Sequence, residues 1–139
     1  EGARRGKEFA VSSFARQIAI GEKNGVYEIR HGNLDSVRTY NHIADAIKAY
    51  WLCSESDRYG EVYNIGGDET CLVGEALDAL IAKSNKPFKK IQDPERMRPT
   101  DITLQIPDTS KFREHYGWKP EKSMDDIWND LLDYWRKRV

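Results

Sequence analysis

A chain of 139 residues is long enough for one ordinary domain with one hydrophobic core. Apolar residues make up 39% of it and charged residues 32%, a balance typical of globular proteins. The formal net charge is −1, from 22 basic and 23 acidic residues, which argues against nucleic acid as a partner because such binders normally carry a basic excess. No stretch approaches the roughly 20 apolar residues of a membrane-spanning helix, so we expect no membrane partner.

The cysteines and histidines lack the spacing of a metal site. Cys53 and Cys71 are not part of a CxxC pair, and the three histidines are far apart in the sequence. We therefore expect two buried free thiols and a reducing, cytoplasmic location. The polar residues 1–7 carry no signal peptide and no initial methionine, and this beginning suggests a chain cut from something longer.

Four segments carry apolar residues at helical spacing, so each is predicted to be a helix with one buried face. In chain order, the four faces are Val11, Phe14, Ala15 and Ile18; Ile43, Ala46, Ile47, Tyr50 and Trp51; Val73, Ala76, Leu77, Leu80 and Ile81; and Met124, Ile127, Trp128, Leu131, Leu132 and Trp135. Ser123 and Asp126 resemble a capping box at the start of the last helix. A short fifth helix is predicted with Asp108 as its N-cap, ending at Gly117.

Three shorter segments favour strands, at residues 26–29, 61–65 and 88–91. Helices and strands alternate along the chain, which predicts an α/β fold. The segment at 61–65 runs into Gly66 and Gly67 before a helix, like the last βα unit of a larger parallel sheet. By itself such a strand would leave an unpaired edge and a bare apolar face.

No motif for nucleophilic, metal or phosphate-loop chemistry is present. GxSxG, HExxH, the P-loop and the GxGxxG dinucleotide fingerprint are all missing, and Gly66–Gly67 is better interpreted as a turn. Ser12 and Ser13 have no histidine near them in the sequence, so packing or a ligand contact is favoured over a nucleophilic role.

Two arginines and an aspartate are the most informative polar residues. Arg38 lies just before a predicted helix, and Arg98 is followed by a proline and, three positions on, by Asp101. Arginines from two separate loops could clamp a diphosphate, and the acid could accept hydrogen bonds from ribose hydroxyls. The competing interpretation, surface salt bridges, is the one that composition alone favours.

Three motifs together resemble a known family: "GNLDSVRTY…ADAIKAYWL", "GEVYNIGGDE" and "RMRPTDITLQIPDTSKFREHYGWKP". They are similar to the C-terminal part of the extended short-chain dehydrogenases that act on nucleotide sugars. Within that superfamily the chain most resembles the GDP-mannose 4,6-dehydratases and the GDP-4-keto-6-deoxymannose reductases. The resemblance covers nearly all 139 residues and implies one unit, residues 1–139, that is the nucleotide-sugar-binding segment of an extended Rossmann-like fold.

The resemblance implies a substrate site. Arg38 of the "VR" motif would contact the diphosphate of a GDP-hexose, with Asn33 of the same motif beside it. Arg98 and Asp101 would contact diphosphate and ribose.

The segment after Arg-Arg-Gly would line the guanine pocket, which suggests Ala10 and Ser13. The dehydratases often have a lysine at the position of Ser13, so this chain departs from them there and is closer to the reductases. Arg16 is a candidate to supply the missing positive charge.

The family's catalytic Tyr-x-x-x-Lys pair and its glycine-rich cofactor loop would lie upstream of this segment. None of the seven tyrosines has a lysine four positions on. The resemblance therefore implies an NADP- or NAD-dependent dehydratase whose cofactor is held outside this segment, and a segment that is inactive alone. The alternatives are the reductase, another nucleotide-sugar epimerase or dehydratase, and a non-catalytic binding or interaction module.

The unpaired sheet edge also leads to a prediction about the oligomeric state of the chain. If the missing strands leave the face of Tyr50, Trp51 and Leu77 bare, the chain should cover that face by forming a homo-oligomer.

Overall fold

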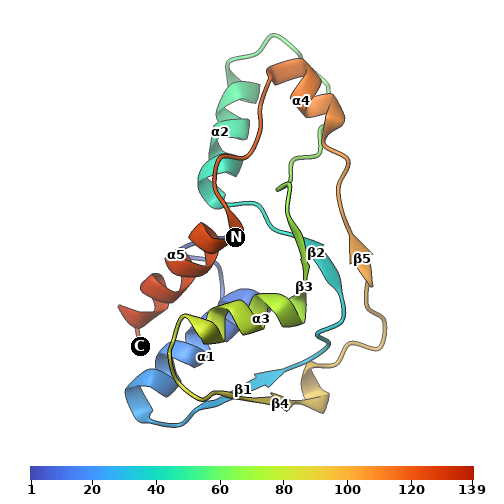
Figure 1. Cartoon of the computed structure of the whole chain (residues 1–139). Helices are drawn as coiled ribbons and strands as arrows, with labels where there is room; N and C mark the ends of the chain where they lie inside the picture. The colour runs from blue at the N-terminus through green and yellow to red at the C-terminus, as the bar shows by residue number, and fades with distance from the viewer.

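The computed structural model describes all of residues 1–139 and shows five helices and five short strands. The helices are α1 (Ala10–Asn24), α2 (Ile43–Ser54), α3 (Val73–Ala82), α4 (Ser110–Tyr116) and α5 (Met124–Arg136), and a single 3-10 turn, η1, covers Pro94–Arg96. Figure 1 shows α1, α3 and α5 packed together at one end of the molecule, while α2 and α4 lie together at the other.

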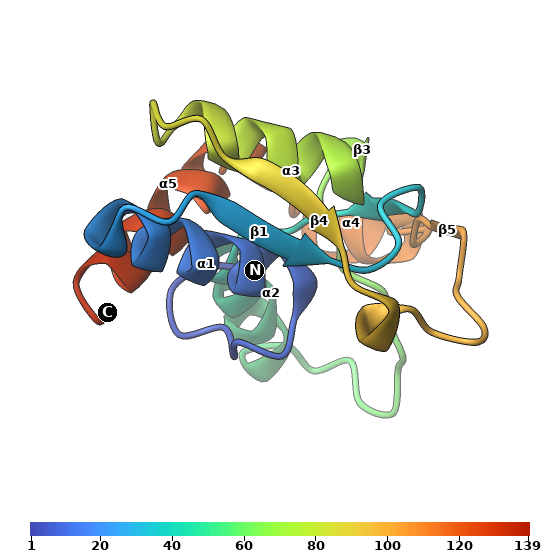
Figure 2. The same ribbon diagram turned by 90° about the horizontal axis from the view of Figure 1, so that it is seen from below.

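The strands form two small sheets. β1 (Glu28–His31) pairs in parallel with β4 (Lys89–Gln92). In the second sheet β2 (Val37–Thr39) is central, antiparallel to β3 (Thr70–Leu72) and parallel to β5 (Leu104–Gln105). Figure 2 shows β1 and β4 running across α1 and α3. The α/β class is confirmed, and two of the predicted strands form within two residues of their expected positions.

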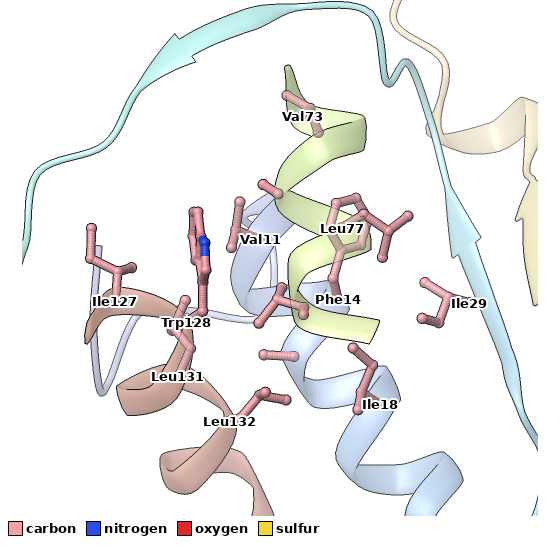
Figure 3. Close-up of a cluster of buried hydrophobic side chains, with 13 residues drawn as sticks. Val11, Phe14, Ile18, Ile29, Val73, Leu77, Ile127, Trp128, Leu131 and Leu132 are labelled. Atoms are coloured by element: carbon pink, nitrogen blue, oxygen red, sulfur yellow. The ribbon is translucent and has the colours of Figure 1, made fainter. Parts of the chain in front are cut away.

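The main core is built from the apolar faces of α1, α3 and α5. Figure 3 shows the side chains of Phe14, Leu77 and Trp128 pointing toward one another from these three helices. Ile29 of β1 closes the cluster and is fully buried. Because α1, α3 and α5 carry their apolar residues at helical spacing, each buries one stripe, as predicted.

Helix α2 forms where it was predicted, but its apolar face is not buried. Trp51 is 64% exposed and Tyr50 69%, and the buried residues of this helix are Asp45 and Ala49. Leu77, which was expected on the same bare face, is instead fully buried in the main core. The prediction that joined Leu77 to Tyr50 and Trp51 is therefore wrong, because α3 packs against α1 and α5 within this chain.

The predicted strand at residues 61–65 does not form. The segment has no β-bridge, and Val62 is 81% exposed. Tyr63 and Ile65 instead pack against a small cluster around Phe112. The sequence has strand character there, but the chain supplies no neighbouring strand to pair with it.

The helix ends agree with the sequence apart from one position. Ser123 and Asp126 form the predicted capping box of α5, with the Ser123 amide donating to the Asp126 carboxylate at 2.9 Å. α4 starts one residue later than predicted: its N-cap is Thr109, while Asp108 accepts the Ser110 amide at 2.9 Å. Gly117 ends α4 in the left-handed region, at φ 62°, a conformation that favours glycine.

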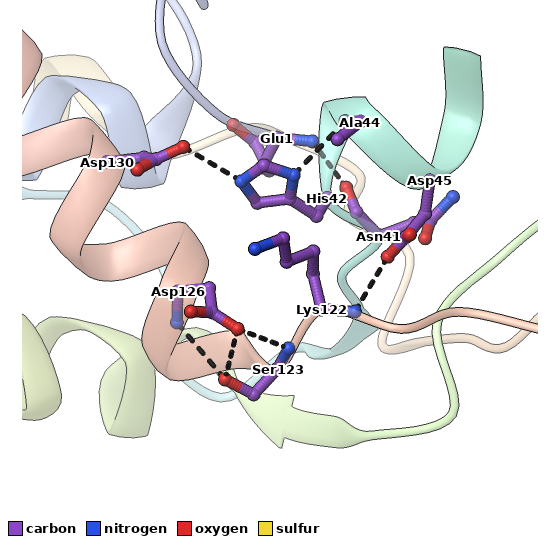
Figure 4. Close-up of polar contacts among 9 residues, drawn as sticks. All are labelled: Glu1, Asn41, His42, Ala44, Asp45, Lys122, Ser123, Asp126 and Asp130. Carbon is purple, nitrogen blue, oxygen red and sulfur yellow. Dashed lines mark hydrogen bonds and ion pairs between the residues drawn. The ribbon is translucent and has the colours of Figure 1, made fainter. Parts of the chain in front are cut away.

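Polar contacts attach α2 to α5 (Figure 4). The ring of His42, at the N-cap of α2, accepts the Ala44 amide through Nδ1 and donates from Nε2 to Asp130 at 2.9 Å. The Glu1 ammonium donates to the Asn41 carbonyl at 2.7 Å. These bonds fix the orientation of the segment that leads from β2 into α2.

The thiols are both free, but neither is buried. Cys53 is exposed and Cys71 is half-buried, which corrects the expectation from composition. Partial burial and the nearby Glu75 and Glu69 carboxylates raise the pKa of Cys71 to about 11. Among the helices, none has the length and apolar character to cross a membrane.

Candidate functional site

A single large cavity of about 1160 Å³ lies between the N-terminal end of α1, the central strand β2 and residues 95–107. Its size suits a ligand larger than a simple metabolite, because pockets for small molecules commonly measure about 300–1,000 Å³. Six of the seven residues selected from the sequence line this cavity: Ala10, Ser13, Asn33, Arg38, Arg98 and Asp101. Residues up to 91 positions apart in the chain, at 10 and 101, therefore meet at one site.

Arg16 does not line the cavity. Its side chain lines a separate basic depression beside Trp135, with its guanidinium 5.7 Å from the indole ring. The structure therefore does not support Arg16 as a replacement charge in a base pocket. Residues three positions apart lie only about 60° apart around a helix, so helical spacing alone does not separate Ser13 from Arg16. The Arg16 side chain extends toward Trp135 of α5, whereas the Ser13 hydroxyl accepts from Arg96 at the cavity wall.

Arg38 and Asp101 form the polar centre of the site. The Arg38 Nη2 lies 3.4 Å from the Asp101 Oδ1, and Nη1 donates to the Val37 carbonyl at 2.9 Å. A guanidinium has five N–H donors, so three of those on Arg38 have no partner in the protein. Arg38 can therefore offer a planar set of donors to an anion while one edge is held by Asp101.

The Asp101 carboxylate is ionised at neutral pH. Ser36 Oγ and Asn33 Nδ2 each donate to Oδ2 at 2.7 Å, and these hydrogen bonds, with a smaller effect of the Arg38 charge, lower the pKa of Asp101 from its usual value. Ser36 is almost completely buried, so its hydroxyl cannot turn to solvent.

Arg98 is exposed and forms no side-chain hydrogen bond or ion pair. It stands on the same segment as Asp101, at the rim of the cavity. An arginine without a protein partner that faces a cavity is available for an anionic ligand.

Sequence reasoning missed two further arginines at the cavity, Arg5 and Arg96. Arg96 Nη1 donates to Ser13 Oγ at 3.3 Å, and its Nε lies 3.3 Å from Asp93. Arg5 stacks over the Phe9 ring at 3.3 Å. Arg96 opens the "RMRPTD" motif and could have been noticed for that reason, whereas no spacing signal links Arg5 to the site.

Ser12 and Ser13 have different surroundings. Ser12 is fully buried, donating to the Arg5 carbonyl at 2.7 Å and accepting from the Trp135 indole at 3.0 Å, so its role is structural. Ser13 reaches the cavity wall, where Gln17 and Arg96 both donate to its hydroxyl. Neither serine has a base within reach.

Tyr40 is the tyrosine that lines the cavity. Its ring packs edge-on against Trp128 at 5.2 Å, and burial raises its pKa well above the usual value. The phenol therefore stays protonated and does not suit the role of a general base.

The chain offers no glycine-rich loop for the diphosphate of a dinucleotide cofactor. The glycine pair at 66–67 is no phosphate loop: a side chain on Gly67 would collide with the Tyr40 carbonyl, so glycine is needed there for close backbone approach. The site offers donors from arginines and an amide, which suit a diphosphate, and one acceptor carboxylate, which suits sugar hydroxyls.

The fold and the cavity together define a class. The structure matches solved enzymes of the extended short-chain dehydrogenase type over nearly its whole length and over less than half of theirs. The protein RMD of Pseudomonas aeruginosa, solved with NADPH, superposes with a TM-score of 0.90 at 24% identity, covering 99% of this chain and 46% of that one. For the UDP-glucose 4-epimerase of Thermotoga maritima, solved with UDP-glucose, the TM-score is 0.83 at 26% identity, and the match covers 99% of this chain and 43% of that one.

Residues 1–131 match the GDP-mannose 4,6 dehydratase family, and the chain belongs to that family. The GDP-6-deoxy-D-mannose reductase of P. aeruginosa is 27% identical over 94% of this chain and 43% of its own length. The GDP-mannose 4,6-dehydratase of Sinorhizobium fredii is 26% identical over 88% of this chain and 40% of its own length. The chain therefore spans about two fifths of the length of these curated relatives. The resemblance inferred from the three motifs is confirmed.

Proposed function

We propose that this chain is the nucleotide-sugar-binding part of a GDP-mannose 4,6-dehydratase, which converts GDP-mannose to its 4-keto-6-deoxy form. One observation carries the proposal: Arg38 and Arg98, which come from two separate segments, line one cavity beside the ionised Asp101. The arrangement suits a diphosphate between two guanidinium groups. Membership of the family and the names of the relatives support the choice of a GDP-sugar.

The part played by this chain would be positioning. The two arginines hold the diphosphate, so the hexose is fixed relative to catalytic groups that this chain does not contain. When bound to an enzyme of this class, the nicotinamide cofactor supplies hydride chemistry, and solved relatives carry NADPH or NAD. Because residues 1–139 contain no glycine-rich dinucleotide loop, we assign the main binding site of the cofactor to residues outside them.

The test is calorimetric titration of the 139-residue chain with GDP-mannose, GDP and UDP-glucose. We expect saturable binding of GDP-mannose and GDP, weaker binding of UDP-glucose, and no change of affinity in Arg16→Ala, a matched arginine outside the cavity. A folded chain that binds none of these nucleotides would contradict the proposal. It would favour the remaining alternative, an interaction module without a nucleotide site.

The second candidate is the reductase that acts on the 4-keto-6-deoxy sugar. It is favoured by Ser13, which occupies the cavity wall where the dehydratases often carry a lysine. The discriminating measurement compares affinities for GDP-mannose and GDP-4-keto-6-deoxymannose. Tighter binding of the keto sugar would favour the reductase.

A further inference from the structure

The site contains a hydrogen-bonded network that its ligand-binding role does not explain. Asp101 accepts from Asn33, Ser36 and Arg38, at 2.7, 2.7 and 3.4 Å. A carboxylate has about four acceptor positions, so these contacts use most of its capacity. An aspartate whose main task was to bind ribose hydroxyls would be expected to keep its oxygens free.

The network is anchored to the rigid part of the molecule. The Ser36 carbonyl accepts the Val73 amide at 3.0 Å and the Leu34 carbonyl accepts the Gly74 amide at 2.9 Å. Both amides belong to the first turn of α3, which contributes Ala76, Leu77 and Leu80 to the main core. The loop 33–36 is therefore fixed to α3, and Asp101 is fixed to that loop.

The same contact also fixes both arginines. Arg38 is held directly, through the Asp101 Oδ1. Arg98 has no side-chain partner, so its position depends on its backbone. Two contacts attach that backbone segment to β2: the bonds of Asp101, and the bond from the Val37 amide to the Thr103 carbonyl at 2.8 Å. Without Asp101, residues 98–102 would keep no side-chain hydrogen bond to the body of the fold, and the nearest one would be that from Gln92 to the Met97 sulfur.

We propose that Asp101 is a positioning residue that sets the geometry of the diphosphate clamp, holding the Arg38 guanidinium in plane and fixing the segment that carries Arg98. This role rests on the proposed function and goes beyond the ribose contact that the family resemblance implies. It predicts that loss of the carboxylate impairs binding of a diphosphate even when no ribose is present.

The probe that separates the two roles is inorganic pyrophosphate, which has a diphosphate but no sugar. In Asp101→Asn the negative charge is lost and one of the two oxygens is replaced by an NH2 group, which cannot accept either from Arg38, at the Oδ1 position, or from Asn33 and Ser36, at the Oδ2 position. We expect pyrophosphate and GDP to bind about tenfold more weakly, a change comparable with one lost charge-assisted hydrogen bond. The penalty should be the same for GDP and its 2′,3′-dideoxy analogue.

A double-mutant cycle tests the coupling. In an Arg38→Ala background, Asp101→Asn should weaken pyrophosphate binding by less than it does in the unaltered chain, because one of the two arginines that Asp101 positions is gone and only the effect on Arg98 remains. Ser36→Ala, which removes one anchor of the carboxylate, should give a smaller loss of the same kind. Asp57→Asn is the matched control, an exposed aspartate outside the cavity.

The outcomes are distinct. Unchanged pyrophosphate affinity in Asp101→Asn, with a penalty for GDP that disappears with the dideoxy analogue, would overturn the proposal and assign Asp101 to the ribose. If the unaltered chain bound neither pyrophosphate nor GDP, the proposed function itself would fail. If circular dichroism shows that Asp101→Asn does not fold, Ser36→Ala provides the test instead. Unchanged pyrophosphate affinity in Ser36→Ala, together with an unchanged side-chain Nε–H resonance of Arg38, would overturn the role.

Discussion

Asp45 and Lys122 are joined across the end of the molecule that contains α2 and α4. The Asp45 Oδ2 accepts the Lys122 amide at 2.9 Å (Figure 4). It also accepts the neighbouring Glu121 amide at 3.2 Å. The Asp45 side chain is 1% exposed, and the Asp45 carbonyl accepts the Trp118 indole at 3.2 Å. One residue of α2 therefore fixes the path of the chain from α4 into α5.

This arrangement predicts a large stability effect at Asp45. Asp45→Ala would leave two backbone amides without an acceptor, and we expect the free energy of unfolding to fall by about 2–4 kcal/mol. Urea denaturation measures it. Asp133→Ala, an exposed aspartate on α5, is the control and should change stability by less than about 0.5 kcal/mol. Equal effects of the two substitutions would show that the Asp45 bonds contribute little.

Arg98 is predicted to act in binding and not in folding. Arg98→Ala should weaken nucleotide-sugar binding by about 1.5–3 kcal/mol, the range for hydrogen bonds to charged groups. The midpoint of thermal unfolding should hardly change, because the exposed side chain has no protein partner. Calorimetry and thermal melts of Arg98→Ala and Arg16→Ala provide the comparison. A lower melting temperature with unchanged affinity would make Arg98 structural.

The dependence of folding stability on pH, at acid pH, should reveal the contribution of the Asp101 carboxylate. The pKa of Asp101 is lowered in the folded state by the bonds from Ser36 and Asn33, whereas an unfolded aspartate titrates near about 3.9. The folded state thus binds the proton less tightly, so the stabilisation is fully present above about pH 4 and is lost as the pH falls through the folded-state pKa.

Thermal melts of the unaltered chain and of Asp101→Asn between neutral and acid pH measure this contribution. The difference in melting temperature between the two proteins should be constant above about pH 5 and should shrink at lower pH. A difference that does not depend on pH would mean that the carboxylate charge makes no contribution to stability.

The isolated chain should show no turnover of GDP-mannose or of its 4-keto-6-deoxy product, with either NADP or NAD. The chain contains no Tyr-x-x-x-Lys pair, and burial raises the pKa of the cavity tyrosine, Tyr40. Product analysis by mass spectrometry checks this. Cofactor-dependent conversion by a pure preparation would refute it.

Self-association should involve α2. Ile47, Tyr50 and Trp51 expose a continuous apolar face, and exposed apolar faces of this kind commonly mark contacts with another protein surface. We expect a dimer or larger assembly at micromolar concentration that Trp51→Glu dissociates, as measured by analytical ultracentrifugation. Tyr59→Glu, an exposed aromatic residue outside α2, is the control. A monomer at all concentrations would contradict the prediction.

The sequence by itself determined the local structure wherever the signal was local. The helix at Met124–Arg136 could be predicted because its capping box and its apolar spacing both act within a few residues. The same holds for α1 and α3, whose apolar stripes are wide enough to select one buried face. The family could also be inferred, because three motifs occur in the correct order along the chain.

Only the tertiary structure decided which surfaces meet. Residues 61–65 have the composition of a strand, but a strand exists only with a hydrogen-bonding neighbour, and none is available here. The apolar face of α2 lacks a covering layer for the same reason, whereas Leu77 finds one in α1 and α5.

The candidate site divides in the same way. The residue types of Arg38, Arg98 and Asp101 could be interpreted from the sequence as groups that bind a diphosphate and a ribose. Their grouping in one cavity, the exclusion of Arg16 from it and the hydrogen bonds from Asn33 and Ser36 to Asp101 depend on contacts between residues more than sixty positions apart. Such contacts are set by the packing of the whole chain, which no local pattern encodes.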